Sequence, residues 1–389
     1  MIRTYKFKLY KTKRLTYLHE LISISADIYN HCIALHKRYY RLYGRTLYLY
    51  PLQKHITKLK KLSRYKYWNK LGSQAIQEIT ERIDRGYKKF FNDKNKRNKR
   101  TPTFKKKSKY KSFTLKGMVG YKLDGSILTI NKKKYKLWLS REIDGSIKTA
   151  TVKRDKLGDF WLLISVSVEN VKPVSHAASG KSVGMDFGLK TFLTLGGRHL
   201  DFADKEREIQ SPLYFLKSIG KIRKLSRTLS LKKKGSNNRK KARLNLAMLH
   251  RKIANQRDDF FHKLSNRLAS EYEYVFIEDL NLKAMQRLWG RKVSDVSYGK
   301  FVNILSYKTN VFKIDRFYPS SKECYDCGYV YRELSLKERV WICPNCGKVH
   351  KRDHNAADNI HRVGTSTLAG DIVRPDFPAN VVDSRIPCL

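Results

Sequence analysis

The stretch SVGMDFGLKTFLTLGG, residues 182–197, places one acidic residue, Asp186, inside an otherwise apolar run. The apolar residues on both sides predict a buried strand and a returning strand, which would open a new domain. An unpaired carboxylate in an apolar strand destabilises a fold unless something compensates its charge. Asp186 therefore indicates either a salt bridge with a lysine or a site that binds cations.

Two further acids follow the same logic. Glu278 lies near the end of the apolar segment YEYVFIEDL, which predicts a second buried strand, and Asp353 heads the helical segment RDHNAADNIHRV. Taken singly, Glu278 or Asp279 could cap the following turn, and Asp353 could be a helix N-cap. Together, three carboxylates could hold two divalent cations about 3.5–4 Å apart, a pair that activates water and stabilises the leaving oxygen in phosphodiester hydrolysis.

The segments between these acids have mixed patterns. Helical spacing predicts a helix over residues 213–231, then the basic break LKKKGSNNRKK, then a long helix over residues 242–270. Residues 301–312 have the pattern of a helix, and residues 313–319 that of a strand. The acids are thus far apart in sequence, and only folding can bring them together.

Four of the six cysteines form two CxxC pairs, CYDCG and CPNCG, with 15 residues between the pairs. Two CxxC pairs, each followed by a glycine, supply four thiolates that fill a tetrahedral ligand shell, which predicts a structural zinc site. An iron–sulfur centre is the alternative. His350 follows closely and could substitute as a ligand, but a surface position is expected for it. The predicted zinc ligands are Cys324, Cys327, Cys343 and Cys346.

The N-terminal half changes pattern twice. Residues 2–10 alternate as a strand does, and residues 15–91 have helical spacing with basic residues between the apolar ones. After a lysine-rich stretch, residues 112–171 consist of short alternating runs separated by Asp-Gly and Gly-Asp turns, which predict an antiparallel sheet or small barrel. Residues 173–180 have the composition of a linker.

The net charge of the chain indicates the class of its partner. The chain has 389 residues, and its 83 Lys and Arg against 34 Asp and Glu give a formal net charge of +49. Such self-repulsion, spread along the whole chain, favours a nucleic-acid partner over a membrane surface. Neither a signal peptide nor a run of about 20 apolar residues is present, so a cytoplasmic, nucleoid-associated location is expected. The basic residues predicted to contact phosphates are Lys96, Arg97, Lys99, Arg100, Lys105, Lys106, Lys107, Lys232, Lys233, Lys234, Arg239, Lys240 and Arg251.

Several of these segments resemble one family. VGMDFGLK, the region from LHRKIANQRDD to IEDLNLKAM, and CYDCG through CPNCGKVHKRDHNAADNI are similar to the three signature regions of TnpB proteins, which are transposon-encoded RNA-guided nucleases ancestral to type V CRISPR effectors. TPTFKKK, SFTL and the closing GTSTLAGDIVRP resemble that family too. The resemblance spans nearly the whole chain.

The resemblance implies a multidomain α+β protein of prokaryotic origin. A helical recognition domain would be inserted into a wedge β-barrel, and a zinc ribbon would interrupt a ribonuclease H-like (RuvC) α/β nuclease domain before its last helix. The implied parts are a wedge domain at 1–12 and 100–172, a recognition domain at 13–99, a linker at 173–180, a nuclease domain at 181–319 and 350–365 with a basic helical insertion at 205–270, a zinc ribbon that binds target nucleic acid at 320–349, and a disordered tail at 366–389.

The resemblance also implies the chemistry. By position, Asp186, Glu278 and Asp353 match the catalytic carboxylates of the family, which hold magnesium or manganese. The partners would be a guide RNA from the transposon end and double-stranded DNA that matches it beside a short motif, where base pairing reads the sequence. One departure is Lys351, since many relatives have an acid there; metal affinity could differ as a result.

Two other functions fit the same residues less completely. One is an RNA-guided repressor that binds DNA without cutting it, which loss of an acid would indicate. The other is a ribonuclease H-like transposase that acts directly on transposon ends without RNA. All three acids are present, which favours cutting.

Overall fold

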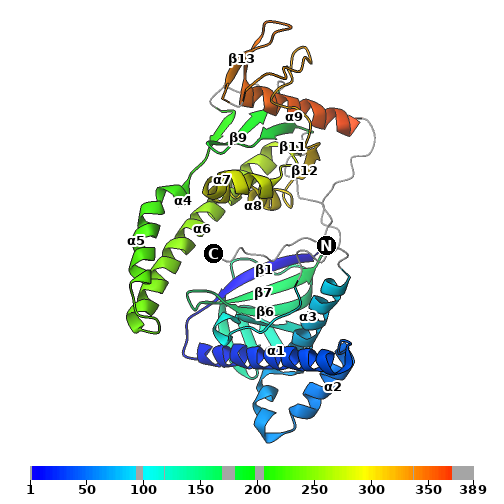
Figure 1. Cartoon of the computed structure of the whole chain (residues 1–389), viewed down its shortest axis with the longest axis vertical. Helices are drawn as coiled ribbons and strands as arrows, with labels where there is room; N and C mark the ends of the chain where they lie inside the picture. The colour runs from blue at the N-terminus through cyan, green and yellow to red at the C-terminus, as the bar shows by residue number, and fades with distance from the viewer. Residues whose placement is uncertain are drawn as a thin grey trace. The chain divides into compact units, whose positions relative to one another are not determined.

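The computed structural model describes residues 2–92, 100–117, 119–168, 180–197, 206–335 and 337–369. The chain divides into two compact units, Met1–Asn170 and Val171–Leu389. Figure 1 shows a sheet and several helices in each unit. The predicted linker, apart from Gly180, and the predicted phosphate contacts Lys96, Arg97 and Lys99 lie outside the described residues.

The first unit is built on a seven-stranded antiparallel sheet that curls into a nearly closed barrel. Alternate residues of its strands are buried, as in the interior strand FWLLISVS. The strand order is β2-β6-β7-β1-β5-β4-β3, so the first strand lies in the middle of the sheet. The strands are β1 Ile2–Leu9, β2 Ser112–Lys116, β3 Tyr121–Asp124, β4 Ile127–Ile130, β5 Lys133–Trp138, β6 Ser146–Arg154 and β7 Phe160–Ser167.

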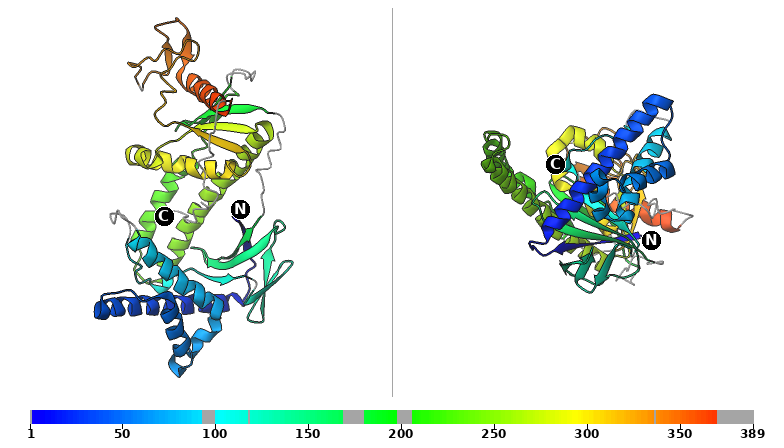
Figure 2. Two further views of the ribbon diagram at one scale, coloured as in Figure 1. Left: turned by 90° about the vertical axis from the view of Figure 1, so that its right-hand side faces the viewer. Right: turned by 90° about the horizontal axis from the view of Figure 1, so that it is seen from below.

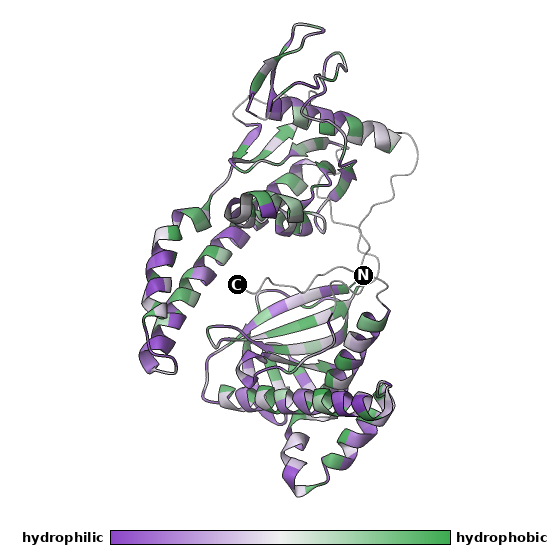
Figure 3. Ribbon diagram, in the orientation of Figure 1, coloured by the Kyte–Doolittle hydropathy of each residue, from purple (hydrophilic) through white to green (hydrophobic). Residues whose placement is uncertain are grey.

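Helices interrupt this sheet between its first two strands in sequence. Along α1, hydrophobic and hydrophilic residues alternate with helical spacing (Figure 3), and Leu18, Ile22 and Ile33 are buried. This helix ends at Gly44, whose φ of 62° allows its N–H to bond the Tyr40 carbonyl. The helices are α1 Leu15–Tyr43, α2 Leu49–Leu59, α3 Ser73–Phe91 and the 3₁₀ helices η1 Ser63–Leu71 and η2 Lys107–Lys109. Helices α1 and α3 both contact β2, so the helical segment packs on the sheet within one unit.

The second unit is built on a five-stranded mixed sheet with the order β10-β9-β8-β11-β12. Strands β8, β11 and β12 are parallel, whereas β9 and β10 are antiparallel to their neighbours. The predicted hairpin at 182–197 is confirmed as β8 and β9. The strands are β8 Ser182–Asp186, β9 Thr191–Gly196, β10 Glu208–Gln210, β11 Tyr274–Glu278 and β12 Asn310–Ile314.

Long helices connect β10 to β11. Helix α6 begins at Asn237, five residues before the predicted start, because the Ser236 hydroxyl accepts a hydrogen bond from the Arg239 N–H at 3.1 Å and caps it. Helices α5 and α6 lie side by side and project away from the five-stranded sheet (Figures 1 and 2). The helices between β10 and β11 are α4 Tyr214–Lys217, α5 Ile219–Ser230 and α6 Asn237–Glu271, and those between β11 and β12 are α7 Leu282–Val296 and α8 Tyr298–Leu305.

Predictions at the next boundary are partly wrong. The helix predicted over residues 301–312 ends at Leu305, and the following strand runs from Asn310 to Ile314 instead of over residues 313–319. Apolar residues recur in both segments, so the sequence offers no change of period at the junction.

Helices cover both faces of the sheet. On one face, Phe261 of α6 and Phe301 of α8 pack with Val183, Met185 and Phe192 of the hairpin. On the other, helix α9 Arg352–Ala369 packs against β8 and β9. Helix α9 extends four residues past the predicted end of the nuclease domain at 365, and residues 370–389 lie outside the described residues. Before α9, the two short strands β13 Val340–Ile342 and β14 Val349–Lys351 form a hairpin.

No helix within the described ranges is both long and apolar enough to cross a membrane.

Candidate active site and metal centre

The three predicted acids lie near enough to one another for the charges of two of them to act on the third. Asp186 is the last residue of β8, Glu278 is the last residue of β11, and these neighbouring strands are parallel, so both acids lie at the carboxyl edge of the sheet. Asp353 is the second residue of α9. Burial, and then the charges of Glu278 and Asp353, raise the pKa of Asp186 to about 8, partly offset by the Phe187 N–H and by Arg352. We call Asp186, Glu278 and Asp353 the carboxylate cluster.

The neighbouring acids Glu278 and Asp279 have different surroundings. Burial raises the pKa of Glu278, although its Oε1 accepts a hydrogen bond from Ser320 Oγ at 2.5 Å that lowers the pKa. Asp279 binds Lys313 Nζ at 2.9 Å and also pairs with Arg316, and the hydrogen bond from Lys313 leads the causes that lower the pKa of Asp279. Asp279 is thus an ion-paired surface acid, whereas Glu278 faces the cluster.

The capping alternatives do not hold in the structure. The helix after β11 is capped by Asn281, whose side-chain oxygen accepts a hydrogen bond from the Ala284 N–H at 3.2 Å. Helix α9 begins at Arg352, so Asp353 lies within its first turn and is not the N-cap. The acids that were possible caps therefore do not serve as N-caps in these two helices.

Two residues beside the acids were not found from the sequence. Arg339, just before β13, places Nη1 3.3 Å from Asp353 Oδ1. Tyr298 is buried against Phe187, and burial together with the nearby Glu278 and Asp186 raises its pKa well above the usual value. Among the described residues, the Tyr298 hydroxyl has no hydrogen-bond partner. Neither residue belongs to a motif, so only the fold could reveal them.

Glycines bring α9 close enough to deliver Asp353. A Cβ atom on Gly196 of β9 would lie 2.1 Å from the Ala357 carbonyl carbon, and a Cβ on Gly364 of α9 would lie 2.1 Å from Phe276 Cγ. No side chain fits at either contact. Helix α9 therefore rests with its backbone directly on the sheet, and its first turn lies beside the ends of the strands.

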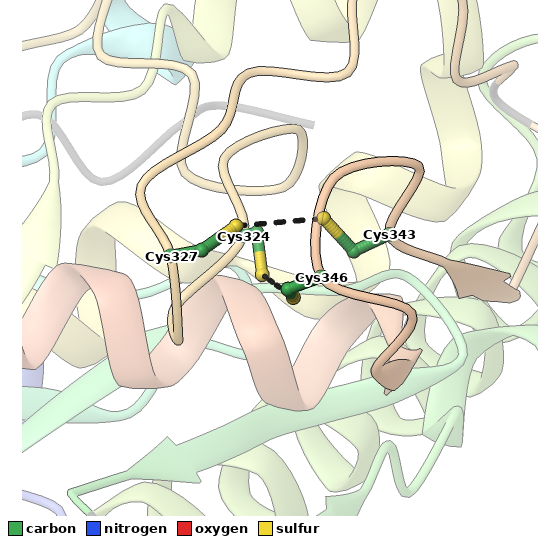
Figure 4. Close-up of side chains that lie close together, drawn as sticks. All are labelled: Cys324, Cys327, Cys343 and Cys346. Carbon is green, nitrogen blue, oxygen red and sulfur yellow. Dashed lines mark hydrogen bonds between the residues drawn. The ribbon is translucent and has the colours of Figure 1, made fainter.

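The four predicted cysteines also converge, on two loops (Figure 4). Their sulfur atoms all lie within 4.8 Å of one another, with Cys324 and Cys346 at 3.6 Å and Cys327 and Cys343 at 3.6 Å. Tetrahedral thiolate ligation with Zn–S bonds of 2.3 Å requires sulfur atoms about 3.8 Å apart. The cluster can hold a metal ion. We call residues 320–349 the cysteine unit.

Glycine shapes both cysteine loops. Gly328 and Gly347 have φ values of 73° and 71°, and their N–H groups bond the carbonyl oxygens of Cys324 and Cys343 at 2.9 Å. The expectation of a surface position for His350 is wrong, since its side chain is buried and its Nε2 lies 3.0 Å from Cys324 Sγ. Strand β14 positions it there by pairing with β13.

The predicted phosphate contacts fall into two groups. Some are engaged within the protein: Lys107 pairs with Asp27 at 2.6 Å, and Arg239 Nη1 donates to the carbonyls of Leu229 and Lys232 at 2.8 Å, which holds the loop between α5 and α6. Arg251 and Lys240 lie on α6, where Lys240 Nζ bonds Asn237. The side chains of Arg100, Lys106, Lys232, Lys233 and Lys234 are exposed, whereas Lys105 Nζ lies 4.8 Å from the centre of the Tyr29 ring.

Comparison with known proteins agrees with these features. Residues 165–288 match the family described as "Probable transposase", and residues 298–360 match "Cas12f1-like, TNB domain". A Streptomyces pristinaespiralis protein named "Putative RNA-guided DNA endonuclease" is 31% identical over 332 residues, which cover 82% of this chain and 79% of that protein. Escherichia coli "Putative RNA-guided DNA endonuclease InsQ" is 27% identical over 331 residues, which cover 79% of this chain and 78% of that protein.

Mimivirus "TnpB-like protein L79" is 28% identical over 56% of this chain and 43% of its own length. Among solved structures, a Cas12f1–sgRNA–target DNA complex has a similar fold, with a TM-score of 0.55 and 15% identity over 90% of this chain and 83% of the Cas12f1 chain. Fold and site thus define a protein of mixed helix and sheet with a carboxylate cluster beside a four-cysteine cluster. The chain belongs to the TnpB-like family of RNA-guided DNA endonucleases.

Proposed function

We propose that this protein is the RNA-guided DNA endonuclease of a transposon. It would cut DNA that pairs with its guide, next to a short adjacent motif. The observation that carries this proposal is the proximity of Glu278 and Asp353 to Asp186, since three such carboxylates would supply a cation site that a DNA-binding protein does not need. The names of the relatives support the same activity.

The carboxylate cluster fits divalent magnesium or manganese. Carboxylate oxygens are the ligands that these hard cations prefer. Burial, and then the neighbouring carboxylates, raise the pKa of Asp186, and a bound cation would favour its ionised form. Asp186, Glu278 and Asp353 would hold the metal, which supplies Lewis acidity and an activated water for phosphodiester hydrolysis. The protein's part is to fix the three carboxylates at one edge of the sheet and to hold them there from both faces.

The second unit would then be a ribonuclease H-like (RuvC) nuclease domain, in which the cysteine unit is a zinc ribbon inserted before the last helix. The donor set suits zinc, since four thiolates on two turns fill its shell and leave no position for substrate. Zinc in the cysteine unit would be structural. The first unit would be a wedge domain with a helical recognition insertion.

Guide RNA and target DNA are the proposed partners, and the net charge of +49 suits both polyanions. The Cas12f1 structure with a similar fold is a complex with both. The exposed basic residues of the loop at 100–107 and of residues 232–234 would neutralise phosphates, and each true contact should lower the salt dependence of binding by about one charge's worth.

Purifying the protein from its host and sequencing the bound RNA tests guidance. A single RNA that ends at the transposon boundary is expected, and random cellular RNA would argue against guidance. DNA matching that RNA should be cut by the complex, whereas Glu278→Gln and Asp186→Asn should bind it without cutting. Asp279→Asn is the matched control, because Asp279 is ion-paired away from the cluster and its loss should leave cutting within about threefold. Full cleavage by Asp186→Asn would contradict the assignment of Asp186 to the catalytic site.

A further inference from the structure

The segment between β12 and the first cysteine is held along helix α9. Asn355 and Asn359 are both buried, and each donates from Nδ2 to the carbonyl oxygen of Glu323 at 2.7 Å. The same two groups donate to the carbonyl oxygen of Ser320, Asn359 at 2.9 Å and Asn355 at 3.4 Å. Residues four apart share one face of a helix, so this face holds the entry to the cysteine unit.

We call the hydrogen bonds from Asn355 and Asn359 the clamp. Further hydrogen bonds extend it to the loop of the first cysteine pair. The Tyr325 N–H donates to Asn355 Oδ1 at 3.0 Å, which places the residue after Cys324 on the same amide. About two turns further along α9, Arg362 Nη1 donates to the Tyr325 carbonyl at 3.0 Å. The segment from Ser320 to Tyr325 is therefore hydrogen-bonded to α9 at both of its ends.

Ser320 connects this clamp to the carboxylate cluster. Its side chain is buried, and its hydroxyl donates to Glu278 Oε1. Its carbonyl is held by Asn359, six residues after Asp353 on the same helix. One residue thus touches both an acid of β11 and the helix that carries another acid.

We propose that Ser320 is a positioning residue, which fixes the Glu278 carboxylate relative to Asp353 so that the cluster binds its metal. This inference rests on the function proposed above. A serine that only fills space would affect stability when truncated, but it would leave metal affinity unchanged. A serine that orients a ligand carboxylate affects metal affinity, typically by about 10–100-fold.

The test compares Ser320→Ala and Ser320→Thr with the parent, each as the complex with its guide RNA. Mn²⁺ binding is measured by electron paramagnetic resonance, and the Asp186→Asn complex defines the Mn²⁺ that the RNA binds. We expect Ser320→Ala to weaken Mn²⁺ binding at the cluster by about 10–100-fold, and to raise the Mg²⁺ concentration for half-maximal cleavage similarly. Ser320→Thr retains the hydroxyl and should recover most of the affinity.

Two controls separate positioning from packing. Ser265→Ala removes another buried serine of the same unit, one whose hydroxyl bonds His262 and Lys308 instead of an acid, and it should leave Mn²⁺ affinity unchanged. In a Glu278→Gln background, Ser320→Ala should cause no further loss of Mn²⁺ affinity. This second comparison also decides the matter if the added methyl of Ser320→Thr prevents folding.

The two proposals fail in different ways. If the parent cuts DNA and Ser320→Ala has the parent's Mn²⁺ affinity and Mg²⁺ dependence, the role of Ser320 is overturned and the nuclease assignment stands. An equal loss of affinity with and without Glu278→Gln would also overturn it, since Ser320 would then act on something else. A parent that binds RNA but never cuts matched DNA would overturn the nuclease function, while the Mn²⁺ comparison would still judge Ser320.

Discussion

Gly184 in strand β8 lies so close to Ala357 in helix α9 that a Cβ atom on the glycine would be 2.3 Å from the alanine carbonyl oxygen. The same Cβ would be 2.5 Å from the backbone nitrogen of His361. Both neighbours are helix backbone, which cannot rotate away as a side chain can. The distance between the strand that ends in Asp186 and the helix that begins beside Asp353 is therefore set by the absence of one methyl group.

Gly184→Ala should displace α9 and separate the acids. We expect the free energy of unfolding to fall by about 1–3 kcal/mol and cleavage to fall much more than RNA binding. Urea unfolding and single-turnover cleavage measure the two effects. Gly220→Ala is the matched control, because a Cβ on this exposed residue of α5 meets nothing within 4 Å and alanine favours a helix. Unchanged cleavage by Gly184→Ala would show that the helix can retreat without moving Asp353.

Removing one thiolate should release the metal of the cysteine unit. Cys343 is buried and its Sγ lies 3.6 Å from that of Cys327, so Cys343→Ser should reduce the zinc content from one equivalent toward zero and impair cleavage through folding of the unit. Atomic emission on the purified complex measures zinc. Cys32→Ala, which changes a buried cysteine of the first unit, should keep the zinc. Zinc retained at full occupancy in Cys343→Ser would exclude four-thiolate ligation.

His36 should make the protein sensitive to acid. It is buried in α1 against Tyr87, neither ring nitrogen has a hydrogen-bond partner among the described residues, and burial lowers its pKa to about 4 despite the nearby Asp84. A depressed pKa means that the unfolded chain takes up the proton first, so stability is full above about pH 6.5 and is lost as the pH falls toward 4. The change corresponds to at most about 3 kcal/mol.

Chemical unfolding at pH 7.5 and pH 4.5 measures this loss for the parent and for His36→Phe. The variant cannot be protonated, so its stability should fall less between the two values. Equal losses in both proteins would show that other groups account for the acid sensitivity.

Patterns that depend on local chemistry were readable from the sequence. Asp186 stands out because an acid is costly within SVGMD, and the cysteine pairs stand out because their spacing matches a ligand set. The start of α6 was missed because Ser236 caps a run of Lys and Arg that has no apolar stripe. The end of α8 was missed because helix and strand are equally apolar there.

Contacts between segments that are far apart in the chain could not be predicted from the sequence. The hydrogen bond from Ser320 to Glu278 joins residues 42 positions apart, and Arg339 reaches Asp353 across the hairpin of the cysteine unit. Serine and arginine are common in surface loops, so neither has a sequence signal of its own. His350 was expected at the surface for the same reason, and the pairing of β13 with β14 buries it instead.

The proton on Asp186 should make metal binding depend on pH. Burial and the neighbouring carboxylates raise its pKa to about 8 in the metal-free protein, so it is mostly protonated at pH 6 and mostly ionised at pH 9. A metal must displace this proton. Apparent Mn²⁺ affinity should therefore increase by about tenfold per pH unit up to pH 8 and then level off.

Competition titrations of the guide-bound complex with Mn²⁺ at pH 6, 7, 8 and 9 measure this slope. Phosphodiester groups of the RNA do not titrate in this range, so their contribution is constant. Asp186→Asn removes the titrating group, and its residual Mn²⁺ binding should be weak and nearly independent of pH. A parent affinity that is flat from pH 6 to 9 would mean that Asp186 is already ionised at pH 6, which would contradict the raised pKa.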